Sequence, residues 1–397
     1  TSLNVNGCTA LESLRCDNNR FTSLDVSGCT ALKELSYCEQ NQLTSLNVSG
    51  CTALQSLSCH RNQISSLNVS GCTALQSLSC HNNKITSLDV SGFKALQNLS
   101  CYNNQITSLD VSGFKALQRL SCYNNQLTSL NVNGCTALKD LSCSSNRLTS
   151  LNVSGCTALQ ELYCNGNQLT SLSVQNCTKL NSLYCGENKL TSLNVSGLKL
   201  LELLTIKQSS LLTSLDASGC IALRSFDCSG ENLTSLNVSG CTTLKELKCS
   251  KNKLTSLNIS GCTALEILYC NRNQLTSINV GGSKALRQLD CYSNQLTSLN
   301  MSGFTALELL DCYDNQLTSL NVSGCTALRT LYCSSNNICE VRPAIFDNIE
   351  TLSYDIRYKY KWDYDQKKYV VDIDHGKGYW YAHEPGGGCH RPDPCNK

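Results

Sequence analysis

The chain has 397 residues, a formal net charge of +2 and only 16% charged residues. This balance excludes the strongly basic surface that is typical of nucleic-acid binding. No run of 18 or more apolar residues is present, so the sequence predicts no membrane-spanning helix. The 29 cysteines are numerous, yet a chain of this length does not need a disulfide framework to fold. Length alone would suggest two or three globular domains.

A 21-residue repeat replaces that estimate with one elongated domain. Residues 75–95 and 96–116 are nearly identical, and the same unit recurs from residue 11 onward. It reads L-x-x-L-x-C-x-x-N-x-L-T-S-L-N-V-S-G-C-T-A, with positions 1 to 21. Two of the repeats have 22 residues. One has an extra residue at Ser36-Tyr37, and the other is an irregular coil at 201–222. Each unit is named by its first residue, and these residues are Leu11, Leu32, Leu54, Leu75, Leu96, Leu117, Leu138, Leu159, Leu180, Leu201, Leu223, Leu244, Leu265, Leu286, Leu307 and Leu328.

The residue pattern predicts one turn of a solenoid per repeat. Leu at position 4 and Cys at position 6 alternate with period 2, as in a strand with one buried face. A unit this short cannot enclose a core alone, but stacked units bury their apolar positions against each other. Asn at position 9 is placed to form a ladder of side-chain amides bonded to the backbone, and Gly at position 18 suits a tight bend. We therefore predict a parallel β-solenoid of about sixteen coils over residues 1–342.

The repeat also carries a family resemblance. The motif L-x-x-L-x-C-x-x-N-x-L is similar to the leucine-rich repeat consensus, with cysteine in the third apolar slot. From Thr1 to about Val341, the phrase N-Q-L-T-S-L-N-V-S-G-C-T-A-L and the stacked cysteines resemble the internalins, a family of bacterial surface proteins. The resemblance implies a curved parallel sheet on a concave side and turns or short strands on a convex side. The sequence departs from the internalins at its start, where their helical cap has no counterpart.

Two columns of cysteine run along the predicted solenoid. Position 6 holds cysteine in fifteen coils and position 19 in eleven. Mostly apolar residues replace it at position 19, which indicates a buried slot where Cys acts as a small apolar residue. We expect free buried thiols in both columns. The alternatives are disulfides between coils, which nearly parallel Cβ directions disfavour, and metal or redox chemistry, for which no C-x-x-C motif is present.

Side chains that alternate with the buried ones, at positions 3, 5, 7 and 8, are expected on the exposed concave face. Tyrosine offers a large flat area and a hydroxyl at low entropy cost, as at many binding sites. Alternatively, such rings stack across strands and only stabilise the sheet. Asp227, Asp314 and a basic cluster of Lys248, Lys251 and Arg272 lie beside them. The candidate ligand-binding residues are His60, His81, Tyr102, Tyr123, Tyr163, Tyr184, Tyr269, Asp290, Tyr292, Asp311, Tyr313 and Tyr332.

Composition changes after Cys339, where both Trp and seven of the sixteen Tyr are found. Residues 357–364 alternate charged and aromatic side chains and predict a strand, and 367–373 and 378–382 predict two more. Residues 343–397 are therefore expected to form a small antiparallel β cap on the last coil, with an irregular tail. For the tail we considered a Cys389–Cys395 disulfide, a metal site with nearby histidines, and carbohydrate binding by the aromatic rings.

Catalytic and nucleotide-binding motifs are missing from the sequence, including G-x-S-x-G, H-E-x-x-H, the P-loop and G-x-G-x-x-G. We therefore expect no enzyme, no cofactor and no metal site. The resemblance to internalins implies an extracellular or cell-surface bacterial protein, expected as a monomer, that adheres to a protein or glycan of a host or neighbouring cell, mucin included. The alternative is a structural or scaffold protein of the cell envelope that associates with itself through an open coil edge.

Overall fold

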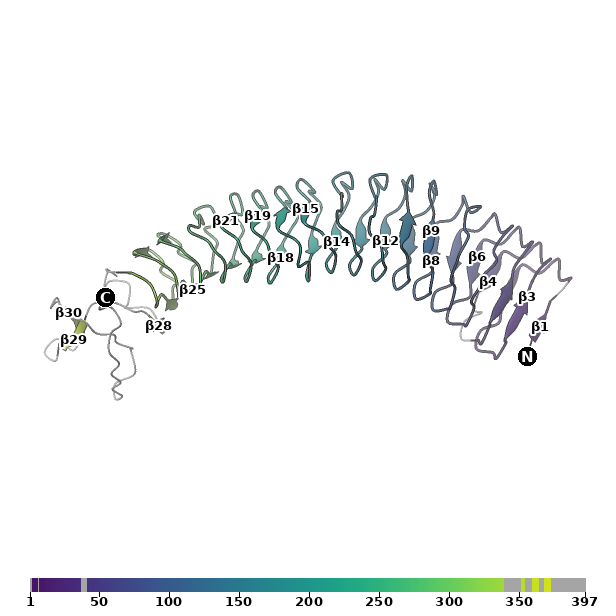
Figure 1. The fold of residues 1–397 in the computed structure, drawn as a ribbon, viewed down its shortest axis with the longest axis horizontal. Helices are drawn as coiled ribbons and strands as arrows, with labels where there is room; N and C mark the ends of the chain where they lie inside the picture. Colours follow the sequence, from purple (N-terminus) through teal and green to yellow (C-terminus); the bar gives the residue numbers. More distant parts are fainter. Residues whose placement is uncertain are drawn as a thin grey trace. The chain divides into compact units, whose positions relative to one another are not determined.

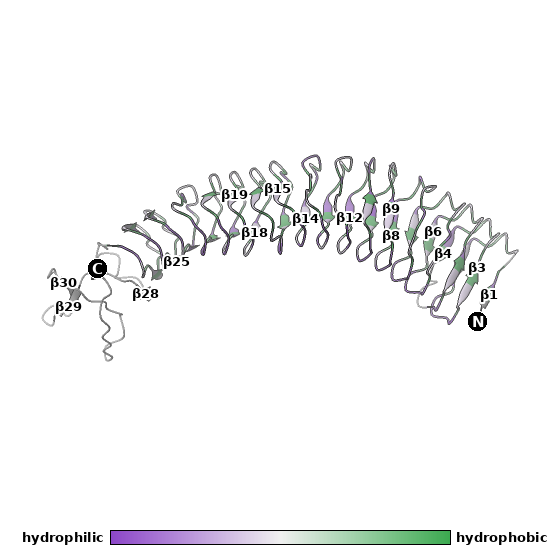
Figure 2. Ribbon diagram, in the orientation of Figure 1, coloured by the Kyte–Doolittle hydropathy of each residue, from purple (hydrophilic) through white to green (hydrophobic). Residues whose placement is uncertain are grey.

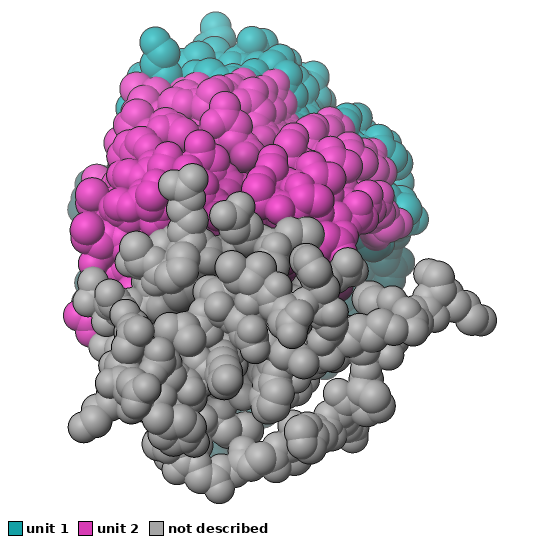
Figure 3. Space-filling view, turned by 90° about the vertical axis from the view of Figure 1, so that its left-hand side faces the viewer, with its two compact units in different colours: residues 1–212 teal, residues 213–397 magenta. Residues whose placement is uncertain are grey.

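The computed structural model describes residues 2–5, 7–36 and 41–338, together with the strands 351–353, 359–363 and 368–372. The chain divides into two compact units, residues 1–212 (unit 1) and 213–397 (unit 2), which Figure 3 colours separately. In each unit the described chain runs as successive coils, and none of the described residues is helical (Figure 1). The predicted leucine-rich repeat β-solenoid is confirmed in both units.

The concave sheet has one strand per coil, at repeat positions 3 to 5, and each unit curves toward this sheet (Figure 1). Neighbouring strands pair in parallel with identical register, as in Leu78 with Leu99 and Leu289 with Leu310. In unit 1 the strands are β2 (Ser13–Arg15), β4 (Glu34–Ser36), β6 (Ser56–Ser58), β7 (Ser77–Ser79), β8 (Asn98–Ser100), β10 (Arg119–Ser121), β12 (Asp140–Ser142), β13 (Glu161–Tyr163), β14 (Ser182–Tyr184) and β16 (Leu203–Thr205). In unit 2 they are β18 (Ser225–Asp227), β20 (Glu246–Lys248), β22 (Ile267–Tyr269), β23 (Gln288–Asp290), β25 (Leu309–Asp311), β27 (Thr330–Tyr332) and β28 (Thr351–Ser353).

Shorter sheets line the convex side at repeat positions 13 to 15. They too are parallel and in register, as in Leu109 with Leu130. Unit 1 contains β1 (Ser2–Asn4), β3 (Ser23–Asp25), β5 (Ser45–Asn47), β9 (Ser108–Asp110), β11 (Ser129–Asn131) and β15 (Ser192–Asn194). Unit 2 contains β17 (Ser214–Asp216), β19 (Ser235–Asn237), β21 (Ser256–Asn258), β24 (Ser298–Asn300) and β26 (Ser319–Asn321).

Apolar side chains of every coil fill the space between the two sides. Hydrophobic and hydrophilic residues alternate in coil after coil (Figure 2). Full burial of a Leu side chain stabilises the fold by about 1.5–3 kcal/mol, so the repeated contacts between coils hold the stack together. In the coil at Leu96 the buried residues are Leu96, Leu99, Cys101, Ile106, Leu109, Val111 and Phe114.

Asn104 shows how repeat position 9 joins neighbouring coils. Its Nδ2 donates to the carbonyl of Cys101 in its own coil at 3.0 Å and to that of Cys80 in the preceding coil at 3.1 Å. Its Oδ1 accepts the backbone N–H of Ile85 at 2.9 Å. The predicted asparagine ladder is confirmed, and it satisfies buried backbone groups that the turn leaves without a strand partner. The same set of bonds recurs at Asn125, Asn146, Asn167, Asn188, Asn273, Asn294 and Asn315.

All cysteines in the described part of the chain are free thiols, as predicted. At position 6 the cysteines act as small apolar residues in the core. Cys143, for example, is fully buried, and burial raises the pKa of its thiol to about 12. At position 19 the prediction of a merely apolar residue was incomplete. The Cys135 Sγ donates to the carbonyl of Val111 at 3.1 Å, and the Cys241 Sγ donates to that of Ala217 at 3.2 Å. The thiol at position 19 therefore also links its coil to the preceding coil by a hydrogen bond.

The C-terminal segment is described only in three strands. β29 (Lys359–Asp363) and β30 (Lys368–Asp372) form an antiparallel pair, which matches two of the predicted strands. β28 was not predicted: it pairs in parallel with β27, Leu352 beside Leu331, and extends the concave sheet. The third predicted strand, 378–382, the tail cysteines 389 and 395 and Cys38 lie outside the described residues. The domain boundary at residue 342 stays a prediction.

Candidate binding face

The candidate residues lie on the concave sheet or two residues after its strands, at positions 5 and 7. None of the twelve is fully buried. Each unit carries six of them. In unit 1 these are His60, His81, Tyr102, Tyr123, Tyr163 and Tyr184, and in unit 2 they are Tyr269, Asp290, Tyr292, Asp311, Tyr313 and Tyr332.

A continuous stack of four rings runs along position 7 in unit 1. His60 lies 4.2 Å from His81 between ring centroids, His81 lies 4.2 Å from Tyr102, and Tyr102 lies 4.4 Å from Tyr123. The planes of successive rings differ by only 9–16°. Because the rings cover one another's faces, the stack offers a partner mainly ring edges, with their hydroxyl and imidazole groups. The stacking that we considered as a purely structural role is present, and it leaves the polar edges available.

The residue after each ring fixes the geometry of this stack. Asn82, Asn103 and Asn124, at position 8, have φ angles of 56°, 52° and 56°, a left-handed conformation that Asn tolerates better than most residues. Their side chains also form a ladder, in which Asn103 Nδ2 donates to Asn82 Oδ1 at 2.7 Å and Asn124 Nδ2 donates to Asn103 Oδ1 at 2.8 Å. The left-handed residue turns the chain directly after the ring, so the rings repeat with the spacing of the coils.

The histidines of the stack are held close to serine hydroxyls. The Nδ1 atoms of His60 and His81 lie 2.9 Å from the hydroxyls of Ser58 and Ser79. Burial, and to a smaller extent His60 and Arg61, lower the pKa of His81 to about 4. His81 is therefore uncharged at neutral pH.

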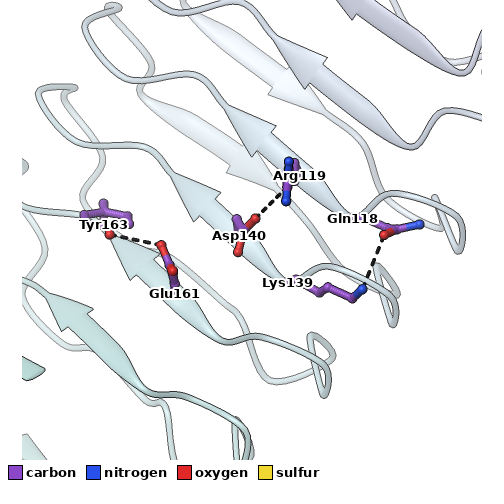
Figure 4. Close-up of polar contacts among 6 residues, drawn as sticks. All are labelled: Gln118, Arg119, Lys139, Asp140, Glu161 and Tyr163. Carbon is purple, nitrogen blue, oxygen red and sulfur yellow. Dashed lines mark hydrogen bonds and ion pairs between the residues drawn. The ribbon is translucent and has the colours of Figure 1, made fainter. Parts of the chain in front are cut away.

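A second ring pair lies further along unit 1. Tyr163 and Tyr184 stack with centroids 4.6 Å apart. The Tyr163 hydroxyl donates to Glu161 Oε2 at 3.0 Å (Figure 4). Burial and the bond to Glu161 raise the pKa of Tyr163 to about 12. Next to Glu161 on the sheet, Asp140 accepts a bond from Arg119 Nε at 2.9 Å (Figure 4), so charged groups border these rings.

The candidate residues of unit 2 surround a pair of carboxylates. Strand register places Tyr269, Asp290, Asp311 and Tyr332 side by side at position 5 of four successive coils, with strands about 4.8 Å apart. Tyr292 and Tyr313 follow the two aspartates at position 7 of the same coils. No stacked pair is found among these tyrosines in the described residues, in contrast to unit 1. Two adjacent carboxylates are thus bordered by four tyrosines.

Burial and mutual repulsion act on this carboxylate pair. Asp290 Oδ1 is inaccessible to solvent and has no hydrogen-bond partner within the described structure. Burial, and to a smaller extent the neighbouring charge of Asp311, raise the pKa of Asp290 to about 6. Burial also raises the pKa of Asp311, whose Oδ1 accepts the backbone N–H of Tyr313 at 3.1 Å. Neither carboxylate forms an ion pair with a cation of the described chain.

The basic cluster lies at the border of this group. Lys248 Nζ lies 5.9 Å from the ring centroid of Tyr269, and the Arg272 guanidinium lies 5.6 Å from that of Tyr292. Lys248 is also paired with Glu246 at 2.7 Å, which raises the pKa of Lys248 and lowers that of Glu246. The cations therefore contact tyrosine rings and Glu246, and they leave the carboxylate pair unneutralised.

Sequence reasoning missed a shallow hollow beside the carboxylate pair. It has a volume of about 430 Å³ and is formed by positions 2 and 3 of the same four coils. Ile267 and Leu309 provide half-exposed apolar surface, and Arg287 pairs with Glu308 at 2.7 Å. The sequence signal that could have revealed it is at position 3, which is Ser in the coils at Leu11, Leu54 and Leu75 but Ile267, Gln288, Leu309 and Thr330 in these four coils. The lining residues are Glu266, Ile267, Arg287, Gln288, Glu308, Leu309, Arg329 and Thr330.

Within the described residues, no group of three or more His, Cys, Asp or Glu is placed to hold a metal ion. The described part of the chain also contains no helix that is long and apolar enough to cross a membrane.

Comparison with known proteins agrees with this geometry. Residues 52–94, 73–115, 94–134, 136–176 and 157–200 match the model of the leucine-rich repeat family. No curated protein sequence matches the chain. Together with the parallel coils, the match shows that residues 52–200 contain leucine-rich repeats.

Among solved structures, the chain resembles the functional domain of InlJ from Listeria monocytogenes, which includes a cysteine ladder. Sequence identity is 31% and the TM-score is 0.51, over 88% of this chain and 65% of that one. This chain therefore spans less than two thirds of the InlJ domain. The leucine-rich repeat protein LIC12759 of Leptospira interrogans (22% identity, TM-score 0.54, 89% of this chain and 99% of that one) and the effector YopM of Yersinia pestis (22%, 0.51, 87% and 90%) share the fold.

Proposed function

We propose that this chain is a non-catalytic recognition protein that binds a protein partner through its concave face, outside a bacterial cell or on its surface. The observation that carries the proposal is the gathering of rings on the concave sheet of unit 1, and of rings with unneutralised carboxylates on the concave sheet of unit 2. Extended concave surfaces are what solenoid proteins use for binding. The likeness to InlJ supports the internalin-like role, an adhesive contact with a surface protein or mucin of a host or neighbouring cell.

The ring geometry in unit 1 favours a protein partner over a glycan. Carbohydrate recognition by aromatic residues relies on free ring faces, and in this stack each inner ring is covered on both sides at 4.2–4.4 Å. The exposed edges supply tyrosine hydroxyls and imidazole nitrogens, which suit hydrogen bonds to polar groups of a protein surface.

Capture with matched variants tests the proposal. The full chain would be immobilised, partners captured from mucosal cell-surface and mucus extracts, and the affinity of each purified partner measured. We expect Tyr102→Ser/Tyr123→Ser or Tyr292→Ser/Tyr313→Ser to weaken binding about tenfold or more. The control Gln105→Ser/Gln126→Ser, in the same coils as Tyr102 and Tyr123 but at position 10, should change affinity by less than about twofold.

Two outcomes would contradict the proposal. If both tyrosine variants bind every captured partner as tightly as the unaltered chain, the concave face is not the binding face. If the purified chain instead forms concentration-dependent polymers in light scattering, the self-associating scaffold of the cell envelope becomes the better account. A glycan array that retains the unaltered chain, with no protein captured, would replace the protein partner by a carbohydrate.

A further inference from the structure

We propose that the concave surface of the four coils from Leu265 to Leu328 binds a basic segment of a partner protein, with an arginine or lysine side chain seated against Asp290 and Asp311. This inference rests on the proposed function and names the chemistry of the partner at one place. Residues of positions 2, 3, 5 and 7 in these coils are called the acidic face. All of them belong to unit 2.

Charge complementarity is the first argument. Asp290 and Asp311 are paired across β23 and β25, both are partly buried, and neither has a cationic partner in the described chain. Two adjacent carboxylates that are removed from water and left unneutralised are unfavourable in the free protein, as the raised pKa of Asp290 shows. An incoming guanidinium or ammonium would remove this repulsion and supply a donor to Asp290 Oδ1, which lacks one.

The tyrosines make the acidic face suited to an organic cation. Tyr269 and Tyr332 border the carboxylates on the same sheet column, and Tyr292 and Tyr313 border them along the chain. Tyrosine faces attract guanidinium and ammonium groups, and in this region the chain's own Lys248 and Arg272 already lie over Tyr269 and Tyr292. Tyr313 is 45% exposed and therefore accessible to a partner.

The neighbouring hollow explains how a segment rather than a single side chain would be held. It runs along the same four coils, and Ile267 and Leu309 offer apolar surface for the aliphatic parts of the segment. Glu266 and Glu308 line the hollow together with Arg287 and Arg329, and the two glutamates are paired with Lys245 and Arg287 at 2.8 and 2.7 Å, so the negative charge of the acidic face comes from Asp290 and Asp311. An extended basic segment would thus contact apolar surface and carboxylates together.

A metal ion fits the acidic face less well. Within the described residues, no third His, Cys, Asp or Glu completes a cluster with this pair, whereas Ca²⁺ takes six to eight oxygen ligands. The border of four tyrosine rings also suits a group with an extended, weakly hydrated charge, as in arginine, better than a compact hydrated ion.

The test uses the full chain and a fluorescent octa-arginine peptide as the probe, with an octa-citrulline peptide of similar shape but no charge as the reference. Binding is followed by fluorescence anisotropy at about 50 mM salt, where charge interactions are weakly screened. We expect Asp290→Asn/Asp311→Asn to weaken octa-arginine binding about tenfold and to leave octa-citrulline unchanged. Asp290→Ser/Asp311→Ser, which introduces the residue found at position 5 of six other coils, should have the same effect if the Asn variant folds poorly.

The matched control is Asp89→Asn/Asp110→Asn. It removes the same two charges from neighbouring coils, but on the convex turns, where most repeats already carry Asn. We expect this control to keep octa-arginine binding within about twofold of the unaltered chain. Equal losses in the control and in the Asp290/Asp311 variants would overturn the inference, because binding would then follow net charge alone. Saturable Ca²⁺ binding that depends on Asp290 and Asp311, without specific octa-arginine binding, would also overturn it and assign the pair to a metal.

The result is separable from the test of the proposed function. If octa-arginine binding does not depend on Asp290 and Asp311, while the binding of captured partners still depends on the concave tyrosines, the proposed cation site is wrong and the recognition role stands. If octa-arginine depends on Asp290 and Asp311 but no captured partner depends on the concave face, the cation site stands and the proposed function fails.

Discussion

Replacing Asp290 by Asn should make the protein more stable at neutral pH, because a partly buried charge is removed. In the folded chain, burial and Asp311 raise the pKa of Asp290 from 3.8 to about 6. The folded state therefore holds this proton more tightly than the unfolded state. Stability contributed by the protonated form is present at low pH and is lost as the pH rises from about 4 to about 6.

The size of the effect follows from that difference. A pKa change from 3.8 to about 6 corresponds to about 3 kcal/mol of unfavourable free energy at pH 7.5. Partial exposure of the carboxylate to solvent reduces this value to about 1–2 kcal/mol. Asp290→Asn removes the charge and keeps the shape, so it should stabilise the chain by about that amount at pH 7.5 and by close to zero near pH 4. The titratable groups beside Asp290 are Tyr269 and Asp311 on the neighbouring strands and Tyr292 in its own coil.

The assay is urea unfolding of the full chain, followed by circular dichroism at several pH values between 4 and 8. The control is Asp110→Asn on the convex side, where the Asp110 Oδ1 caps the N–H of Ser112 at 2.8 Å and Asn can do the same; it should change stability by less than about 0.5 kcal/mol. A destabilised Asp290→Asn variant at pH 7.5, or a stability difference that does not vary with pH, would refute the reasoning about the carboxylate pair.

Three further predictions concern the coils themselves. Asn104→Ala removes three bonds and leaves the buried N–H of Ile85 without its acceptor, while the carbonyls of Cys80 and Cys101 keep the bonds from Asn83 and Asn125, so urea unfolding should show a loss of about 1–3 kcal/mol; the exposed Asn98→Ala should lose less than about 0.5 kcal/mol, and equal losses would disprove the ladder's role. Gly186→Ala places a Cβ 2.3 Å from the Lys207 carbonyl oxygen, so the melting temperature should fall, and an unchanged melt would contradict this backbone contact. Thiol titration without reductant should find at least the 25 described cysteines free in denaturant and only a few reactive in the native chain; far fewer in denaturant would indicate disulfides.

The architecture could be predicted from the sequence because every coil repeats the same short-range signals. These signals act within a coil or between neighbouring coils. They are Leu at positions 1 and 4, the left-handed turn after position 7 and the amide of position 9. The 21-residue repeat therefore specifies the structure of every coil. The gathering of Tyr102 and Tyr123, or of Asp290 and Asp311, also follows directly, because in-register stacking places equal positions side by side.

Features that depend on side-chain packing could not be predicted in the same way. The sequence does not show that Tyr102 and Tyr123 stack face to face while Tyr292 and Tyr313 do not, because ring orientation depends on the neighbouring residues. The bond from Cys135 to the Val111 carbonyl and the burial that shifts Asp290 depend on the same packing. β28, in contrast, could have been predicted from the repeat pattern, because Ile349 and Leu352 match repeat positions 1 and 4.

The central claim is that a protein partner contacts the concave columns of this chain. Hydroxyl-radical footprinting of the full chain, with and without a purified partner, tests it directly, because tyrosine and histidine side chains are labelled where they are accessible. The account predicts that the partner protects residues of the concave face, such as Tyr102, Tyr292 and Tyr313, and leaves the labelling of the exposed Leu200, which lies outside the concave strands, unchanged. Undiminished labelling of every concave tyrosine, together with protection confined to the convex side, would contradict it.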